Sequence, residues 1–196
     1  MAELALFCED RGHELFTRAI INRLAEEAGI AVNIRVISAS RGKGVALSQL
    51  KGWQRLFDKG LTVGKPGLLV VVIDGNGVGF QAKQREIEKL IQTHVFPNYV
   101  IGCPDPHVER WCFADANAFE RVVGSAPPRD PGKFKRAVYK KLLHDSLLQN
   151  GQVFLTDEME VAPDIVRVAD LYRAGKAQPS LGAFVDGLRK GLSALR

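Results

Sequence analysis

Two apolar stretches of the sequence run directly into an acidic residue. The stretch LALFC is followed by Glu9, and LLVVVI is followed by Asp74. A third acid, Glu109, comes shortly after the apolar stretch YVIGC. Neighbouring carboxylates repel one another, and a bound cation relieves that repulsion. Because Mg²⁺ binds to a few carboxylates together with water and phosphate oxygens, these acids are candidates for a divalent-metal site.

The turn after Asp74 reads DGNGVG and adds a possible ligand, Asn76. Its glycines allow a sharp bend, so that the Asp74 and Asn76 side chains can face one ion. Asn offers a neutral oxygen where Asp would offer a charged one, which predicts weaker metal binding than a double-Asp site. A dinucleotide-binding glycine motif is disfavoured, because these glycines follow the third predicted strand and lack its spacing.

The elements that would position these acids alternate along the first half of the chain. Apolar patterns predict strands at residues 4–8, 32–36, 68–74 and 99–103, and helices at 16–28, 47–57 and 80–94. Strands that alternate with helices predict right-handed crossovers and a parallel sheet. The unbroken run at 68–73 is typical of a central strand that is covered on both faces. Ligands bind beyond the carboxyl ends of such strands, which is where the acids stand.

The second half of the chain has no comparable strand pattern. After the loop GSAPPRDPGK, helical patterns cover residues 134–148, 165–172 and 181–195, with Ser180 as a candidate N-cap. We therefore predict an α/β domain at residues 1–125, with about four parallel strands flanked by helices. A helical extension at residues 126–196 would pack on it, so that the two form one structural unit.

Composition indicates an ordinary globular protein. The chain has 196 residues, of which 46% are hydrophobic and 25% charged, and a formal net charge of +5. No stretch approaches the roughly 18 apolar residues of a membrane span, so no membrane partner is expected. Three cysteines are an odd number and favour a reducing compartment, which predicts a cytoplasmic location. The positive charge is compatible with a polyanionic partner.

The order of the motifs resembles the Toprim-like family, most closely its small stand-alone bacterial members, which are related to the Toprim domains of the overcoming-lysogenization-defect nucleases. The matching segments are CEDRGHE, DGN, HVERWCFAD and the closing QPSLGAFVDGLRKGL, so the resemblance spans nearly the whole chain. Two positions depart from the family pattern. Asn76 replaces the second Asp of an Asp-x-Asp motif, and Asp10 replaces the usual Gly after Glu9.

The resemblance implies a Toprim-like fold and an Mg²⁺- or Mn²⁺-dependent nuclease that cleaves DNA or RNA. It further implies a role in bacterial defence or a mobile element, and a possible partner ATPase, since the chain has no Walker-type phosphate loop of its own. The implied catalytic residues are Glu9, Asp74 and Glu109. The implied metal ligands are Glu9, Glu14, Asp74, Asn76 and Glu109, around one ion or two.

Several alternatives remain open from the sequence. The protein could be a non-catalytic subunit that binds nucleic acid or a partner ATPase. A zinc site at Cys103, His107 and Cys112 is disfavoured, because the spacing lacks short paired ligands. His13 is expected to be an exposed residue at a helix start, or a proton shuttle. The basic residues that could follow a phosphate backbone, or simply cover a solvated surface, are Arg11, Arg41, Lys43, Lys83, Arg110, Lys133 and Lys135.

Overall fold

The computed structural model describes residues 1–39, 45–62, 64–131, 137–153 and 156–196. At its centre lies a four-stranded, all-parallel sheet with the strand order β2-β1-β3-β4. This confirms the predicted α/β class. The strands are β1 (Ala2–Cys8), β2 (Val32–Ser38), β3 (Leu68–Val72) and β4 (Tyr99–Gly102).

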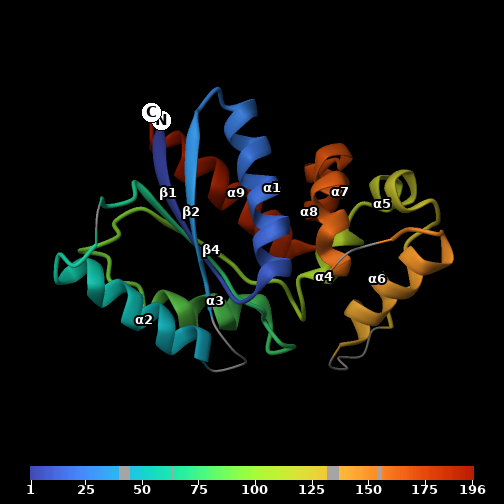
Figure 1. Ribbon diagram of the computed structural model, residues 1–196, viewed down its shortest axis with the longest axis horizontal. Helices are drawn as coiled ribbons and strands as arrows, with labels where there is room; N and C mark the ends of the chain where they lie inside the picture. The colour runs from blue at the N-terminus through green and yellow to red at the C-terminus, as the bar shows by residue number, and fades with distance from the viewer. Residues whose placement is uncertain (40–44, 63, 132–136, 154–155) are drawn as a thin grey trace.

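Helices cover both faces of the sheet (Figure 1). One face carries α1 and α9, and the other carries α2 and α3. Helix α7 packs beside α1, α5 packs against α7, and α6 packs against α4. Within the described residues, no helix has the length and apolar character needed to cross a membrane. The helices are α1 (Arg11–Glu27), α2 (Val45–Asp58), α3 (Phe80–Glu88), α4 (Glu109–Cys112), α5 (Ala116–Val123), α6 (Val138–Gln149), the 3-10 helix η1 (Glu158–Val161), α7 (Ala162–Val168), α8 (Leu171–Ala177) and α9 (Pro179–Ser193).

Strand β3 is buried along its whole length, as its apolar run predicted. Its side chains alternate between two hydrophobic cores. Leu68, Val70 and Val72 belong to the core under α1 and α9, which also takes in residues of the C-terminal helices. Leu69 and Val71 belong to the core under α2 and α3. The helices of the second half therefore help to bury one face of the sheet.

The strand order places a topological switch point between β1 and β3. From β1 the chain crosses to β2 on one side, and it then returns to add β3 on the other side of β1. Connections that leave in opposite directions open a crevice at the carboxyl ends of the two strands, where ligands of parallel sheets bind. Glu9 directly follows β1, and Asp74 follows β3 by two residues. Both acids therefore stand at the switch point.

The helix after β3 is shorter than predicted, because it ends at Glu88 rather than near residue 94. The fully buried Gln54 of α2 accounts for the difference. Its Nε2 donates to the Leu90 carbonyl (3.0 Å), and its Oε1 accepts from the Gln92 amide (2.8 Å). These backbone groups would be bonded within the helix if it continued, so a tertiary contact replaces its last turns.

The predicted helix at 165–172 is divided into α7 and α8. Arg23 of α1 donates from Nη1 to the carbonyls of Val166 (2.7 Å) and Ala169 (2.6 Å), which ends α7. Asp170 then caps α8, since its side chain accepts from the amides of the next turn.

Gln178 is the N-cap residue of α9, and Pro179 fills the first turn. The prediction that Ser180 is the N-cap is therefore wrong. The Ser180 hydroxyl instead accepts a hydrogen bond from the indole of Trp111 (2.9 Å).

Asp115 joins two of the C-terminal helices. It caps α5 by accepting from the Asn117 amide (3.2 Å), and it accepts from the Asp170 amide before α8 (2.7 Å). Arg173 donates to both of its oxygens, from Nε (3.0 Å) and Nη2 (2.8 Å). Burial opposes ionisation of Asp115, but these donors prevail and hold its pKa below the ordinary 3.8.

We expect Gly102→Ala to destabilise the protein by about 1 to 3 kcal/mol, because the added Cβ would lie 2.8 Å from the ring of buried Phe184. Gly52→Ala is the matched control. No atom lies within 4 Å of a Cβ at this position in α2, so the better helix propensity of Ala should stabilise by about 0.5 to 1 kcal/mol. Urea unfolding of the two variants measures both effects, and a neutral Gly102→Ala would contradict the close packing of α9 on β4.

Asp115→Asn should cost about 1 to 3 kcal/mol at pH 7, because it removes the charge that Arg173 and two backbone amides stabilise. The lowered pKa means that this contribution is complete above pH 3.8 and is lost as the pH falls through the pKa of the folded state. The stability difference between wild type and variant should therefore shrink from pH 7 to pH 3 in urea titrations. Asp186→Asn, at an exposed carboxyl, is the control and should change stability little at either pH. A difference that stays constant with pH would contradict the assignment.

Candidate functional site

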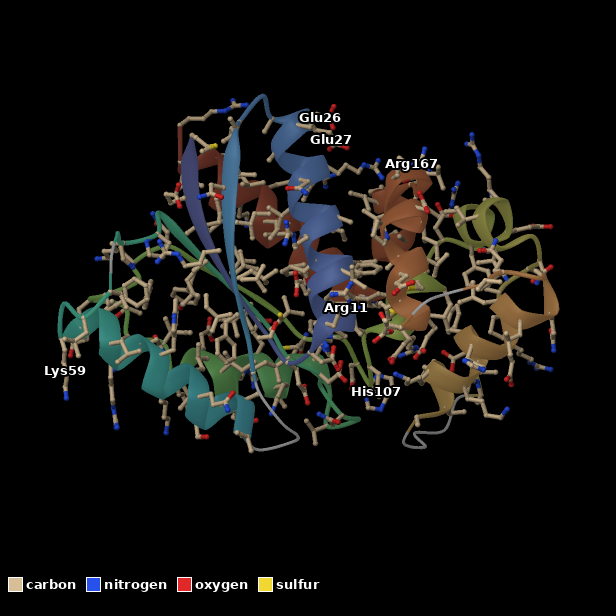
Figure 2. The ribbon with its side chains drawn as sticks, in the orientation of Figure 1. Arg11, Glu26, Glu27, Lys59, His107 and Arg167 are labelled. Carbon is tan, nitrogen blue, oxygen red and sulfur yellow. The ribbon has the colours of Figure 1, made fainter. Side chains whose placement is uncertain are left out.

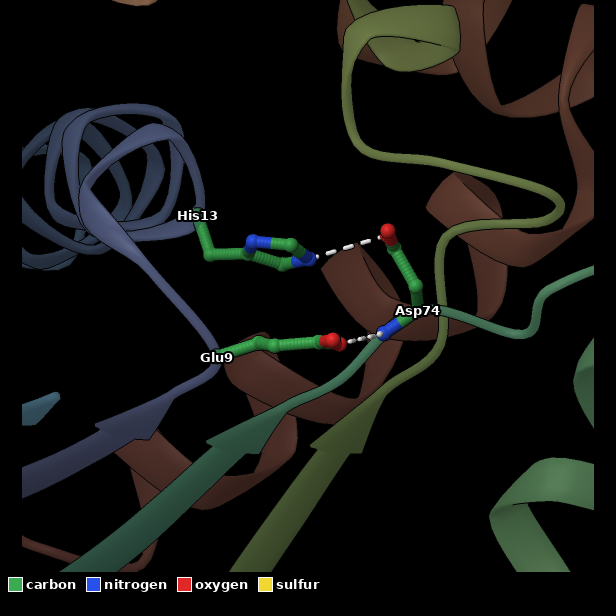
Figure 3. Close-up of side chains that lie close together, drawn as sticks. All are labelled: Glu9, His13 and Asp74. Atoms are coloured by element: carbon green, nitrogen blue, oxygen red, sulfur yellow. Dashed lines mark hydrogen bonds and ion pairs between the residues drawn. The ribbon is translucent and has the colours of Figure 1, made fainter. Parts of the chain in front are cut away.

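Glu9 and Asp74 meet at the switch point. Their strands are hydrogen-bonded neighbours in which Cys8 pairs with Val72, so the residues that follow lie side by side. The Asp74 amide donates to Glu9 Oε2 (3.2 Å), as Figure 3 shows. Asp74 is 8% exposed and Glu9 is half-buried. The two acids thus form a partly desolvated pair.

His13 joins this pair, contrary to the expectation that it is exposed. It stands in the first turn of α1 and is 1% exposed. Its Nε2 lies 2.9 Å from Asp74 Oδ1, and its Nδ1 lies 2.7 Å from Asp10 Oδ1. Asp10 is also the N-cap of α1 and accepts from the His13 amide (3.1 Å). Asp10 therefore has a structural role, which is to begin the helix and to hold the imidazole.

His107 contacts the second oxygen of Asp74, with 2.8 Å between His107 Nδ1 and Asp74 Oδ2. Two hydrogen bonds join the loop after β3, which carries Asp74, to the loop after β4, which carries His107. The Gly75 amide donates to the Pro104 carbonyl (2.6 Å), and the Gly77 amide donates to Asp105 Oδ1 (2.9 Å). A Cβ on Gly75 would lie 2.8 Å from that Asp105 oxygen, so this close approach needs glycine.

The disfavoured zinc site has no counterpart among the described residues. His107 turns toward Asp74, while Cys103 and Cys112 are buried thiols outside the group of potential metal ligands. Burial raises the pKa of Cys103 to about 12, and it raises that of Cys112 well above its ordinary value. Neither thiol is therefore prepared to bind a metal as a thiolate.

The hydrogen bonds define the charge of His13. An ionised carboxylate only accepts, so an imidazole that faces a carboxylate at each nitrogen must donate from both and carry a positive charge. Burial alone would lower the pKa of His13, but the charges and hydrogen bonds of Asp74 and Asp10 raise it well above 6.5. Burial likewise opposes ionisation of Asp74, yet His13 and His107 lower its pKa. The cluster therefore contains a cation of its own, the imidazolium of His13.

Two further carboxyl groups near Asp74 hold their protons more tightly than usual. Burial raises the pKa of Glu9, and the charge of Asp74 adds to this effect. Glu109, at the first position of α4, also has a pKa that burial and the Asp74 charge raise. A carboxyl group with a raised pKa suits proton transfer, because it is protonated more often near neutral pH.

The structure does not bring Glu14 into the cluster. Glu14 Oε1 pairs with Arg18 one turn along α1 (3.2 Å). The Asn76 amide nitrogen donates to the backbone carbonyl of Asp74 (3.0 Å), which fixes the turn and leaves Asn76 Oδ1 buried without a hydrogen-bond partner. Of the implied ligand set, Glu9 and Asp74 lie together, while Glu109 is near enough for the charge of Asp74 to raise its pKa.

The donor atoms of the cluster are of the kinds that bind a divalent ion. Among the residues that the structure describes, Glu9, His13 and Asp74 form the one group of three in which a ligand atom from each lies within 4.8 Å of the others. Two carboxylates and an imidazole are common ligands of divalent metals, so the donor set fits such an ion. A cation there would take the place of the proton on His13 Nε2.

Arg110, an expected phosphate contact, is engaged within the protein. Its Nη1 donates to the Asp105 carbonyl (2.8 Å), and its Nη2 donates to Asp130 (2.6 Å). Its guanidinium also lies over the Tyr139 ring, 5.7 Å from the centroid, and the Tyr139 hydroxyl donates to Asp130 (2.8 Å). Arg110 thus connects the β4 loop to α6.

The other basic candidates differ in their surroundings. Lys83 pairs with Glu86 on α3 (3.0 Å). Arg11 is exposed at the N-terminal end of α1, and in Figure 2 this end of the helix points toward His107. Arg41, Lys43, Lys133 and Lys135 lie outside the described residues.

The fold and the cluster define a class: an α/β protein that carries two carboxylates and an imidazole at the switch point of a parallel sheet. Comparison with known proteins adds no family to this class. No protein-family model matches the chain, and searches of curated proteins and of solved structures found no match.

We expect His13→Gln to cost about 2 to 4 kcal/mol in the metal-free protein, because it removes the positive charge that faces Oδ1 of buried Asp74. His94→Gln is the control. His94 is exposed and pairs with exposed Asp58, so its loss should cost less than about 0.5 kcal/mol. Urea unfolding with EDTA at pH 6 measures both, and equal effects would contradict the ion pair between His13 and Asp74.

Proposed function

We propose that this protein is a metal-dependent nuclease that hydrolyses phosphodiester bonds in DNA or RNA, with Mg²⁺ or Mn²⁺ as cofactor. The observation that carries the proposal is the group of Glu9, His13 and Asp74 at the switch point. The resemblance of CEDRGHE, DGN and HVERWCFAD to the Toprim-like family supports the same chemistry. Ligands of open parallel sheets bind at this position, so substrate and ion would meet there.

The residues have separate tasks in this proposal. Glu9, His13 and Asp74 hold the ion, which when bound stabilises charge on the phosphoryl oxygens and lowers the pKa of a water. The water oxygen forms a bond to phosphorus as the ester P–O bond breaks. Glu109, with its raised pKa, gives its proton to the leaving oxygen. The phosphomonoester product then releases a proton, which restores Glu109.

The proposed partners follow from charge and from the family resemblance. A net charge of +5 and exposed Arg11 beside the crevice favour a polyanion such as DNA or RNA. Three free cysteines favour a cytoplasmic protein. We further propose a role in bacterial defence or in a mobile element, with a separate ATPase as a possible partner, as in related Toprim-like nucleases.

Glu9→Gln, Asp74→Asn and Glu109→Gln should each reduce Mg²⁺- or Mn²⁺-dependent cleavage about a hundredfold or more, because each removes a ligand or the proton donor. Glu14→Gln should keep its activity, since this acid pairs with Arg18 instead. The assay uses plasmid DNA, single-stranded DNA and transfer RNA with each metal. If Glu9→Gln and Asp74→Asn cleave as the wild type does, the site assignment is wrong.

A second candidate function is a non-catalytic subunit that binds nucleic acid or a partner ATPase. The specific observation in its favour is that both oxygens of Asp74 already face an imidazole, so Asp74 is paired without a metal. Three results together would favour this function over the nuclease. The protein would cleave none of the three substrates, it would still bind nucleic acid, and calorimetry would detect no binding of Mg²⁺ or Mn²⁺.

A further inference from the structure

We propose that Glu9, His13 and Asp74 bind a single divalent transition-metal ion, and that the His13 nitrogen makes the site prefer such an ion to Mg²⁺. Asp10 and His107 are positioning residues that orient His13 and Asp74. The inference deepens the proposed function and rests on the same cluster as its metal site. It differs from a site with only oxygen ligands in the choice and number of ions.

The preference follows from the chemistry of the donor atoms. Mg²⁺ favours oxygen ligands and binds imidazole weakly, whereas transition metals bind both imidazole and carboxylate. His13 Nε2 lies 2.9 Å from Asp74 Oδ1, so it is within reach of an ion bound by Asp74. Glu9, half-buried beside them, adds a carboxylate oxygen within 4.8 Å of both partners. The third donor is therefore a nitrogen.

Asp10 gives independent support for a ligand role of His13. A histidine that binds a metal through one nitrogen usually donates its other N–H to a carboxylate, which fixes the ring and increases its basicity. His13 has this arrangement, with Nδ1 2.7 Å from Asp10 Oδ1. The same Asp10 oxygen accepts from the His13 amide (3.1 Å), so the ring is held by the first turn of α1. Nε2 is thereby directed toward Asp74 and Glu9.

His107 orients Asp74 in the same way. Its Nδ1 lies 2.8 Å from Asp74 Oδ2, which leaves Oδ1 as the oxygen that faces His13 and an ion. A carboxylate that bridges two ions needs one oxygen for each, and here Oδ2 is already engaged. Glu14, an expected ligand of a second ion, is engaged as well, since it pairs with Arg18. These contacts favour one ion per chain.

The test measures metal binding without nucleic acid. Calorimetry at pH 7 with the full chain should give one Mn²⁺ per chain, bound about tenfold or more tightly than Mg²⁺. Pulsed electron paramagnetic resonance of bound Mn²⁺ should detect a directly coordinated nitrogen. The resonance signal needs no variant, so it is decisive even if a substitution at His13 impairs folding.

Variants separate the ligand from the residues that position it. His13→Gln should abolish the nitrogen signal and bring the Mn²⁺ and Mg²⁺ affinities close together. Asp10→Asn keeps an N-cap side chain but weakens Mn²⁺ binding about ten- to a hundredfold, with the nitrogen signal retained. His107→Gln should weaken Mn²⁺ binding and also keep the signal, while His94→Gln, far along the sequence at an exposed pair, should change neither.

Three outcomes would overturn the inference: equal affinity for Mg²⁺ and Mn²⁺, two ions per chain, or bound Mn²⁺ without a nitrogen signal. Absence of any metal binding would overturn the inference and the metal-dependent function together. In the other cases, the inference about the metal ion and the nuclease function can fail separately. A protein that binds one Mn²⁺ through nitrogen but cleaves no nucleic acid keeps the inference and loses the nuclease, whereas Mg²⁺-dependent cleavage without a nitrogen signal does the reverse.

Discussion

The contact on which the site depends is the buried carboxylate of Asp74 between two imidazoles. One oxygen faces His13 of α1, and the other faces His107 of the β4 loop. A carboxylate that is 8% exposed is costly unless it is paired and hydrogen-bonded, so both histidines are required by the position of Asp74 itself. Through this one side chain, three separate segments of the chain are held at the crevice.

Sheet topology is the reason that such a costly group can exist there. The reversal of strand order between β1 and β3 leaves space at their carboxyl ends, and parallel pairing fixes Glu9 beside Asp74. Asp105 then binds the turn after Asp74, which keeps the β3 and β4 loops together. The result is a hydrogen-bonded cluster in which a proton on His13 and a divalent ion would occupy nearly the same place.

Sequence reasoning recovered part of this site and missed the rest for a physical reason. Glu9 and Asp74 were found because an acid after an apolar strand has a position that strand pattern alone predicts. His13 was missed, although Asp10 three residues earlier is an N-cap signal that places it in the first turn of a helix. His107 carries no such signal. Its partner is 33 residues away, and only loop packing brings them together.

The amino-acid sequence by itself determined the α/β class, the buried central strand and the placement of two acids at strand ends, because these follow from local hydrophobic periodicity. Tertiary structure alone decided where α3 ends, since Gln54 takes over its backbone hydrogen bonds. It also decided the protonation of the cluster. The charge state of a carboxylate or an imidazole depends on burial and on neighbours distant in the chain, and no local pattern contains that information.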